Sequence, residues 1–260
     1  MKRIFLLLSV ALLISCTQQQ ESKNTTAVTE NETEVTDEIS PDAVPDVDDA
    51  TVVLEPSTQS IELGEVEGGG YQTQEISELF RQGTSAYANN DFKTGITFFN
   101  KIIEENPEDP RAYYNLGIGY FRLNKFPEAI KAFSGAINIS PMDSLAIQFR
   151  GRVYYMMGNF KSSLEDYKRV VELTPTDPVA YYNRGLARGR TNDYLGAIMD
   201  FDKTIELDPE NAKAYYNRGL ANLHQGRLHD ACYDWRKAHS LGHYEAEKAI
   251  RGYCEGNKEE

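Results

Sequence analysis

The feature that most constrains the fold is a sequence repeat with a period of about 34 residues in the C-terminal two thirds of the chain. Prolines recur with this period at Pro107, Pro141, Pro175 and Pro209. Glycines recur at Gly83, Gly117, Gly151, Gly185 and Gly219, and aromatic residues at Phe99, Phe133, Tyr167, Phe201 and Trp235. Such a period is typical of arrays in which each unit is too small to fold alone and stacking of neighbours supplies the core.

Each unit is expected to contain two helices, as the second unit shows. Its apolar residues follow a helical period over about 110–123 and again over about 126–139. Pro110 suits the first turn of a helix, where the missing N–H has no cost. Asn124 is expected to form the turn between the helices, and Pro141 ends the second helix.

The same residues carry a family resemblance. The pattern Tyr113-x2-Leu116-Gly117-x2-Tyr120, then Ala129-x3-Phe133, then Pro141 resembles the tetratricopeptide pattern, with Tyr in place of the usual Trp. The resemblance implies an all-α, right-handed superhelical solenoid of five repeats. Within residues 71–242, the predicted units are about 76–109, 110–143, 144–177, 178–211 and 212–243.

The last unit departs from the pattern, because His243 occupies the slot of the terminal proline. The next residues, 244–254, are predicted to form a capping helix with Ala246, Ala249 and Ile250 facing inward. Arrays of this kind need such a cap to cover the last apolar face. Residues 255–260 are predicted to be a polar tail.

The N-terminal segment indicates export. Lys2 and Arg3 precede the apolar run 4–14, which is too short to span a bilayer as a permanent helix. Residues 1–15 are therefore predicted to be a signal peptide. The sequence Leu13-Ile14-Ser15-Cys16 resembles the lipobox of bacterial lipoproteins, which implies lipidation of Cys16. Thr17 after the cysteine favours the outer membrane over the inner by a rule that holds only in some clades. The alternative is an ordinary signal peptide with a chance cysteine.

Residues 16–70 are predicted to be the lipidated cysteine and a disordered acidic tether. Between Thr17 and Gly70 there are 14 acidic residues, one Lys and no aromatic residue, so this stretch alone carries the net charge of -13. The apolar patch from Thr51 to Leu54 either docks on a partner or is incidental to a solvated linker. An acidic chain is a poor binder of nucleic acid, so no nucleic-acid partner is expected.

Charged residues in the last three units suggest ion pairs between the two helices of a unit. Arg precedes the repeat glycine, and Asp precedes the repeat aromatic, only in these units. The predicted pairs are Arg150 with Asp166, Arg184 with Asp200, and Arg218 with Asp234. Contacts to a charged ligand are the alternative role for these residues.

The resemblance also implies a binding groove, because the first helices of tetratricopeptide units line a concave surface. Tyr114, Gln148, Tyr182 and Tyr216 share one position in this register, with Phe80 in the first unit. The predicted groove set is Tyr114, Asn115, Phe121, Arg122, Arg152, Tyr155, Tyr182, Asn183, Arg190, Tyr216, Asn217 and His224.

Amides in such a row can hydrogen-bond an extended peptide backbone, and aromatic and Arg side chains are common interface anchors. The alternative is that these residues are repeat consensus on a wet surface. Related arrays clamp a terminal carboxylate with a pattern of Lys and Asn, and this pattern is absent. The Lys position holds the residues of the register that starts at Phe80 and ends at Tyr216, and the Asn position holds Thr84, Ile118 and Leu186.

The sequence contains no motif that argues for an enzyme. It has no Gly-rich phosphate loop, nucleophile elbow or HExxH. The histidines His224, His229, His239 and His243 cluster near the C-terminus, but they are better explained as polar decoration of the last unit than as a metal site. We therefore expect no cofactor and no metal.

Two cysteines remain once Cys16 is assigned to the lipid. Cys232 lies near the start of the last unit's second helix and Cys254 at the far end of the predicted cap. Antiparallel helices would bring these ends together, so a disulfide between them is predicted in an oxidising compartment. Alternatively the two thiols are unrelated, and Cys232 is a small core residue.

The combined prediction is a lipid-anchored adaptor of the bacterial cell envelope that binds a protein or extended peptide. The alternatives are an accessory regulator of an envelope hydrolase or protease, and a receptor for peptides or cell-wall fragments.

Overall fold

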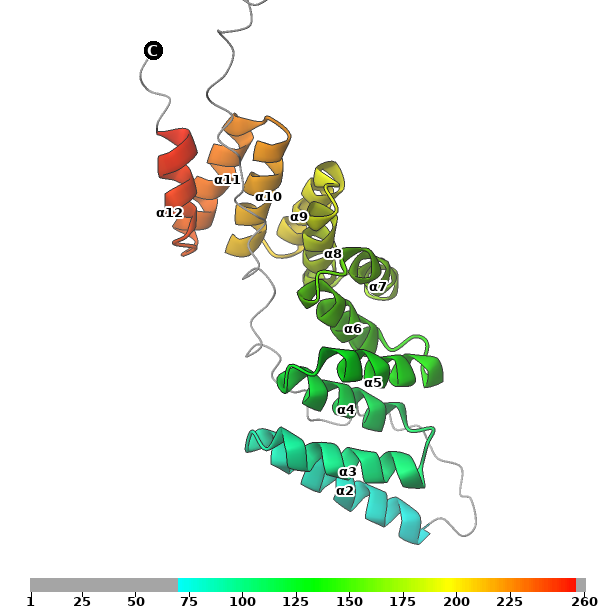
Figure 1. The fold of residues 1–260 in the computed structure, drawn as a ribbon. Helices are drawn as coiled ribbons and strands as arrows, with labels where there is room; N and C mark the ends of the chain where they lie inside the picture. Colours follow the sequence, from blue (N-terminus) through cyan, green and yellow to red (C-terminus); the bar gives the residue numbers. More distant parts are fainter. Residues whose placement is uncertain (1–69, 256–260) are drawn as a thin grey trace, which may run out of the picture. The chain divides into compact units, whose positions relative to one another are not determined.

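The structure is a computed structural model that describes residues 70–255, and these residues form helical hairpins with no strand. The hairpins follow one another in chain order (Figure 1). The first two are α2 (Gly70–Ala88) with α3 (Phe92–Glu105), and α4 (Pro110–Arg122) with α5 (Phe126–Ile139). The next three are α6 (Ser144–Met156) with α7 (Phe160–Leu173), α8 (Pro178–Arg190) with α9 (Tyr194–Leu207), and α10 (Ala212–His224) with α11 (Leu228–Ser240). The all-α repeat array expected from the sequence is thus confirmed.

The first helices start at a repeated cap. Asp109, Asp143, Asp177 and Asn211 each accept a hydrogen bond from a backbone N–H in the first turn of the following helix. These caps satisfy donors that the helix itself leaves unpaired. They occupy the same position in each of these repeats, so the period fixes the helix starts as well as the core.

The turn inside each hairpin requires a residue with positive φ. Asn90, Asn124, Asn192, Gly158 and Gly226 occupy this place, with φ between 57° and 75°. Only Gly, and to a lesser degree Asn, adopts this conformation at low cost. The turn predicted at Asn124 is therefore confirmed, and it recurs in every unit.

The core is built from the repeat glycines and aromatics. A Cβ added at Gly117 would lie 2.6 Å from the ring of Phe133, and one at Gly185 would lie 2.8 Å from the ring of Phe201. Phe99, Phe133, Phe201 and Trp235 are fully buried and Tyr167 nearly so. Glycine on the first helix therefore lets the aromatic side chain of the second helix pack against its backbone.

The C-terminal cap differs from the single helix predicted for it. It consists of a short helix, α12 (Ala246–Ala249), followed by one π-helical turn, η3 (Ile250–Cys254). Ala246 and Ala249 are buried, as expected, and Ile250 packs against the same apolar cluster. At the other end, α2 begins at Gly70 rather than near residue 76.

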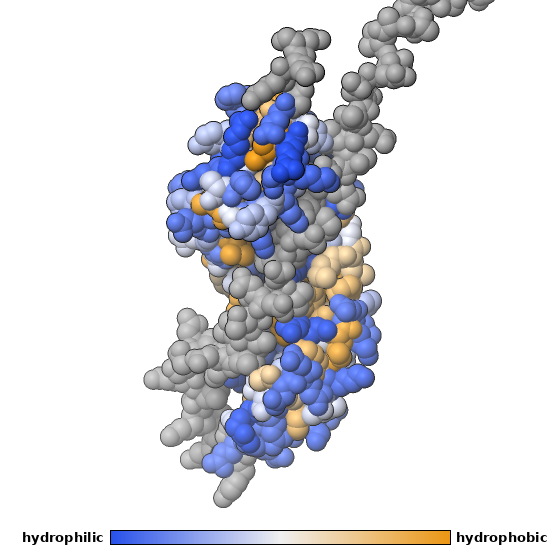
Figure 2. Space-filling view, turned by 90° about the vertical axis from the view of Figure 1, so that its left-hand side faces the viewer, coloured by the Kyte–Doolittle hydropathy of each residue, from blue (hydrophilic) through white to orange (hydrophobic). Residues whose placement is uncertain are grey.

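The predicted signal peptide, the lipobox at Cys16 and the acidic tether lie outside the described residues, apart from Gly70. Within residues 70–255, no helix has both the length and the apolar character needed to cross a membrane. Figure 2 shows hydrophobic residues in small groups among hydrophilic ones on the face drawn. The exposed large apolar residues include Met142, Met199 and Tyr233.

Candidate functional site

The candidate binding surface is the one that the first helices share, and we call it the inner surface. Residues three and four positions apart lie on the same face of a helix. On α6 this face carries residues 145, 148, 152, 155 and 156, and the repeat register gives the equivalent positions on α4, α8 and α10. The adjacent first helices α8 and α10 also contact each other directly.

Charge is strongly segregated between first and second helices. The four first helices α4, α6, α8 and α10 contain no Asp or Glu but carry nine Arg and Lys residues. The second helices α5, α7, α9 and α11 carry nine Asp and Glu and seven Arg and Lys. The first helices are therefore basic within a chain whose net charge is -13.

The structure divides the predicted groove set into two halves. Six of its members are at least partly accessible, namely Tyr114, Asn115, Arg122, Arg190, Tyr216 and His224. The other six are buried, namely Phe121, Arg152, Tyr155, Tyr182, Asn183 and Asn217. The expectation that the whole set projects from the core is therefore wrong for the second half.

Tyr182 and Asn217 illustrate the physical reason. The ring of Tyr182 is only 4% exposed and packs 5.9 Å from the ring of Phe201. The amide of Asn217 is fully buried and donates to the Tyr182 hydroxyl at 3.2 Å and to the Lys213 carbonyl at 2.9 Å. These two residues join α8 to α10, so they hold neighbouring units together.

Tyr87 plays a comparable part between the first two units. Its buried hydroxyl donates to the backbone carbonyl of Asn115 at 2.9 Å. A Cβ at Gly119 would lie 2.0 Å from that hydroxyl oxygen, so glycine is needed for this contact. The side chain of Asn115 bonds its own helix, at the Arg111 carbonyl. Burial raises the pKa of Tyr87, which therefore remains protonated.

The Arg and His residues predicted at one groove position also form contacts between units. Arg122 lies 4.8 Å from the ring centroid of Phe92, and Arg190 lies 4.6 Å from that of Phe160. His224 stacks at 4.4 Å on Tyr194. In each case the residue that ends a first helix covers the ring that begins the second helix of the preceding unit.

The sequence shows this contact only when residues of adjacent units are compared with each other. A comparison of equivalent repeat positions does not reveal it. The ring and the residue that covers it occupy different repeat positions, and they belong to adjacent units. Such contacts are worth about 0.5–2 kcal/mol, depending on desolvation. They place the charged ends of Arg122 and Arg190 at the junctions between units.

Two apolar residues of the inner surface were not predicted from the sequence. Leu145 and Val179 start this face on α6 and α8 and are 43% and 40% exposed. The equivalent positions on α4 and α10 hold Arg111 and Lys213. The inner surface thus combines exposed aliphatic side chains with basic ones. The sequence indicated this, because one repeat position holds a basic residue in two of these units and an aliphatic residue in the other two.

The three predicted ion pairs are present and link the two helices within a unit. Arg150 Nη2 lies 2.7 Å from Asp166 Oδ1, Arg184 Nη2 lies 2.6 Å from Asp200 Oδ1, and Arg218 Nη2 lies 2.5 Å from Asp234 Oδ1. Each pair is bidentate, with Nε donating to the same carboxylate. Hydrogen bonds to Asp200 raise the pKa of Arg184. These geometries fit a structural role.

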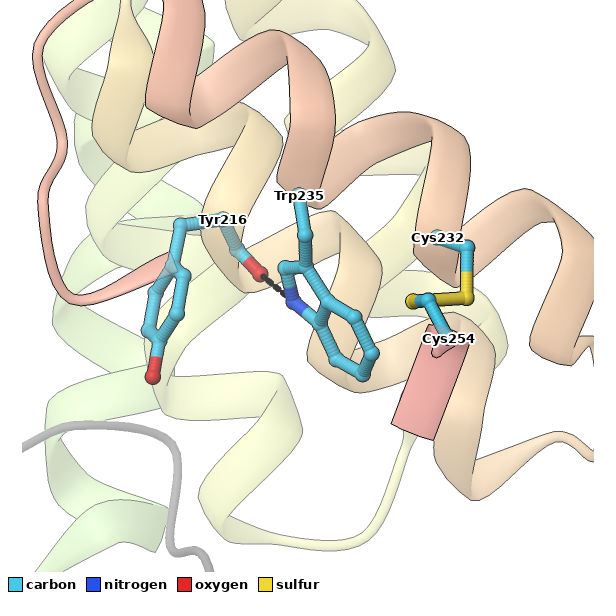
Figure 3. The surroundings of a disulfide bond; sticks show 4 residues. All are labelled: Tyr216, Cys232, Trp235 and Cys254. Carbon is cyan, nitrogen blue, oxygen red and sulfur yellow. Dashed lines mark hydrogen bonds between the residues drawn. A yellow bond between two sulfur atoms is a disulfide. The ribbon is translucent and has the colours of Figure 1, made fainter. Parts of the chain in front are cut away.

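The predicted disulfide joins Cys232 on α11 to Cys254 at the end of η3, with the Cα atoms 5.8 Å apart. It lies beside Trp235, whose indole donates to the Tyr216 carbonyl at 3.2 Å (Figure 3). The ring of Tyr253 packs 5.6 Å from the indole. The bond therefore fastens the cap to the aromatic core of the last unit.

No arrangement suited to metal chemistry occurs among residues 70–255, where no three His, Cys, Asp or Glu side chains gather at a site. His224 and His243 stack on tyrosines, and His229 is exposed.

A pocket of about 250 Å³ between α9, α10 and α11 is lined by Arg218 and Asp234 among others. One of the structural ion pairs thus forms part of its charged wall, together with Asp202, Arg227 and Asp230.

Comparison with known families and structures agrees with the hairpin repeat. A model described as "Tetratricopeptide repeat" matches residues 80–144 and 182–238, and one described as "TPR repeat" matches residues 151–192. The search of curated proteins gave no match.

Several solved structures share the fold at low sequence identity. MamA from Desulfovibrio magneticus RS-1 (residues 41 to the end) is 22% identical, with a TM-score of 0.62 over 64% of this chain and 94% of that one. YrrB, described as a TPR protein with an unusual peptide-binding site, is 22% identical, with a TM-score of 0.63 over 70% and 95%. A tetratricopeptide repeat protein from Parabacteroides merdae is 21% identical, with a TM-score of 0.60 over 64% and 66%.

Arrays of this type are in general non-catalytic scaffolds for protein–protein interaction. The family models, the repeated hairpins and the similar structures lead to one conclusion: this chain is a tetratricopeptide repeat protein.

Proposed function

We propose that this protein is a lipid-anchored adaptor of the bacterial cell envelope whose inner surface binds an extended segment of a protein partner. One observation carries the proposal. The first helices α4, α6, α8 and α10 combine exposed aliphatic residues with basic residues and contain no Asp or Glu. The similarity to YrrB, a protein described by its peptide-binding site, supports it.

The accessible residues of the inner surface suit a peptide. Leu145 and Val179 offer apolar contact on adjacent first helices. Tyr114 and Tyr216, on the flanking first helices, are partly exposed and also pack on Phe149 and His243. Aromatic and Arg side chains are common anchors of interfaces, and Tyr loses little conformational freedom on binding because it has only two χ angles. The buried half of the groove set then acts as the rigid support beneath these contacts.

The anchor is proposed from the sequence. The box ending in Cys16 would place the array at a membrane, and the non-Asp Thr17 favours the outer one. The disulfide between Cys232 and Cys254 agrees with export, since such bonds persist in oxidising compartments. One acyl chain gives only marginal membrane binding, so stable anchoring needs the several chains of a mature lipoprotein.

The binding surface is tested by photo-crosslinking in the native envelope. The photoreactive residue p-benzoylphenylalanine is placed at Leu145 or Val179 on the inner surface, and at Leu195 or Tyr233 on second helices as controls. All four side chains are exposed, so substitution should not disturb the core. Adducts with a defined partner are expected from the inner positions alone, whereas adducts only from Leu195 or Tyr233 would move the site to the second helices.

Mass spectrometry of the adduct separates the possible partners. A single protein supports the adaptor, an envelope hydrolase or protease points to an accessory regulator, and a glycan fragment points to a receptor.

The anchor is tested independently by metabolic labelling. Radioactive palmitate should enter the wild-type protein and not the Cys16→Ala variant. Equal labelling of both proteins would contradict lipidation at this residue.

A further inference from the structure

We propose that the inner surface selects anionic segments and that the chain's own residues 37–55 occupy it in the absence of a partner. This inference rests on the proposed function, because it names the chemistry of the segment that the same surface binds. The proposed occupant is a part of this chain that lies outside the described residues.

The first argument is the charge of the surface. From α4 to α10 the first helices carry nine Arg and Lys and no acid. Arg150, Arg184 and Arg218 are matched by Asp side chains of second helices. Arg111 pairs with Asp109, and Arg188 also lies beside Asp200. Arg122 lies over a ring face, and Lys213 lies at the start of α10. A ring face and the first turn of a helix do not supply a full negative charge to Arg122 and Lys213, so a ligand that brings carboxylates is favoured.

The second argument is the composition of residues 37–55. This stretch contains seven acidic residues and no Lys or Arg. Pro41 and Pro45 disfavour helix and favour an extended backbone, which is the form that a row of helices can bind along its length. The apolar residues Val52, Val53 and Leu54 follow the acidic cluster, and they can contact Leu145 and Val179.

The third argument is reach. Fifteen residues separate Leu54 from Gly70, where α2 begins, and they include Gly64, Gly68 and Gly69. Such a linker spans about 20 Å on average and at most about 50 Å. Packed helices lie about 8–10 Å apart, so three steps along the first helices, from α2 to α8, amount to about 30 Å. The segment can therefore reach the inner surface of its own chain.

A tethered ligand competes strongly even when its contacts are weak. Flexible linkers of this length give effective concentrations of about 1 mM. A segment with an intrinsic Kd near about 100 μM would then lower the apparent affinity of an external anionic peptide about tenfold. A partner would have to displace the segment, so the tether would set the threshold for binding.

The experiment uses a fluorescein-labelled peptide with the sequence of residues 37–55 and measures its anisotropy. It is titrated with the full chain carrying Cys16→Ser, and with the same chain in which Asp42, Asp46, Asp48 and Asp49 are also changed to Asn. We expect the neutralised chain to bind the peptide about tenfold more tightly. Equal affinity for both chains, or no binding to either, would overturn the proposal.

Two further measurements identify the surface. Arg122→Gln with Arg190→Gln should weaken binding by the neutralised chain at least fivefold, whereas Lys161→Gln with Arg236→Gln, on second helices, should leave it unchanged. Raising the salt from 50 to 300 mM should also weaken binding, and this readout needs no variant at a contact between units. Equal effects of the two double variants would contradict binding at the inner surface.

The two proposals fail separately. If photo-crosslinking at Leu145 and Val179 captures a partner while the peptide of residues 37–55 does not bind, the binding surface stands and the tethered occupant is rejected.

Discussion

The indole ring of Trp235 packs on the backbone of Gly219, so closely that a Cβ at residue 219 would lie 2.5 Å from the indole nitrogen. The indole N–H donates to the neighbouring Tyr216 carbonyl at 3.2 Å. The same relationship between a first-helix glycine and a second-helix aromatic recurs in the earlier units. It explains why the period appears in glycine and aromatic residues together.

We predict that Gly219→Ala destabilises the last unit by about 1–3 kcal/mol, because the added methyl group overpacks the core. Trp235 is the only tryptophan in the chain, so its fluorescence during urea unfolding reports on this unit. Gly252→Ala is the matched control, since a Cβ there meets nothing within 4 Å. Equal unfolding midpoints for the two variants would contradict the packing argument.

We predict that Asp200→Ala is more destabilising than Arg184→Ala. Asp200 lies 2.6 Å from Arg184 and 3.0 Å from Arg188, so its loss leaves Arg184 without a carboxylate and Arg188 with only the longer contact to Asp193 at 3.6 Å. Breaking a buried pair in this way costs about 3–5 kcal/mol. Removal of Arg184 costs less, because Arg188 remains beside the carboxylate.

The double variant provides the check on this pair. Chemical denaturation followed by circular dichroism should give non-additive losses of stability. Additivity within about 0.3 kcal/mol would reject a direct interaction.

Tyr182 should behave as a core residue despite its position in the predicted groove. We expect Tyr182→Ala to cost about 3–5 kcal/mol, as for other large buried aromatics. Tyr182→Phe should cost about 0.5–1.5 kcal/mol, since it loses only the hydrogen bond from Asn217. Thermal unfolding measures both changes, and a fully stable Tyr182→Ala variant would show that the ring does not join α8 to α10.

Stability should decrease as the pH falls below about 6.5. Burial lowers the pKa of His243 and of His224 from the usual value of 6.5. The unfolded chain then takes up protons before the folded chain does, so folding loses stability by at most about 1.4 kcal/mol per pH unit for each group. Glu245 and Lys213 are the charged groups that act on His243.

The His243→Asn variant tests the contribution of this imidazole. Unfolding between pH 7.5 and 5.5 should show a weaker pH dependence in this variant than in the wild type. His229→Asn is the control, because its side chain is 98% exposed. A wild-type slope in His243→Asn would exclude this residue as a source of the pH dependence.

Loss of the disulfide should destabilise the cap. The bond closes a loop with a sequence separation of 22 residues, which corresponds to about 3 kcal/mol in the chain-entropy model. Cys254→Ser should therefore shift the urea midpoint of Trp235 fluorescence downward, because Tyr253 and the cap cover the indole. Cys16→Ser should leave it unchanged, and full alkylation of both Cys232 and Cys254 in protein isolated without reductant would show that the bond does not form.

Sequence by itself determined the architecture, because the features that specify a helical hairpin are local. The positive-φ residue at Asn124, the cap at Asp109 and the match of Gly117 with Phe133 each concern one unit. The repeat then carries these local solutions from one unit to the next. The ion pair between Arg184 and Asp200 was also readable, because both residues appear and disappear together among the units.

Only the tertiary structure decided which first-helix residues are accessible. Tyr182 and Tyr216 share one repeat position, yet Tyr182 is buried by Phe201 and Asn217, whereas Tyr216 is partly exposed and stacks on His243. Repeat position specifies the direction in which a side chain leaves its helix. Burial depends on how far the neighbouring unit is rotated and on the side chains that it brings, and these are properties of the stacked array rather than of a single repeat.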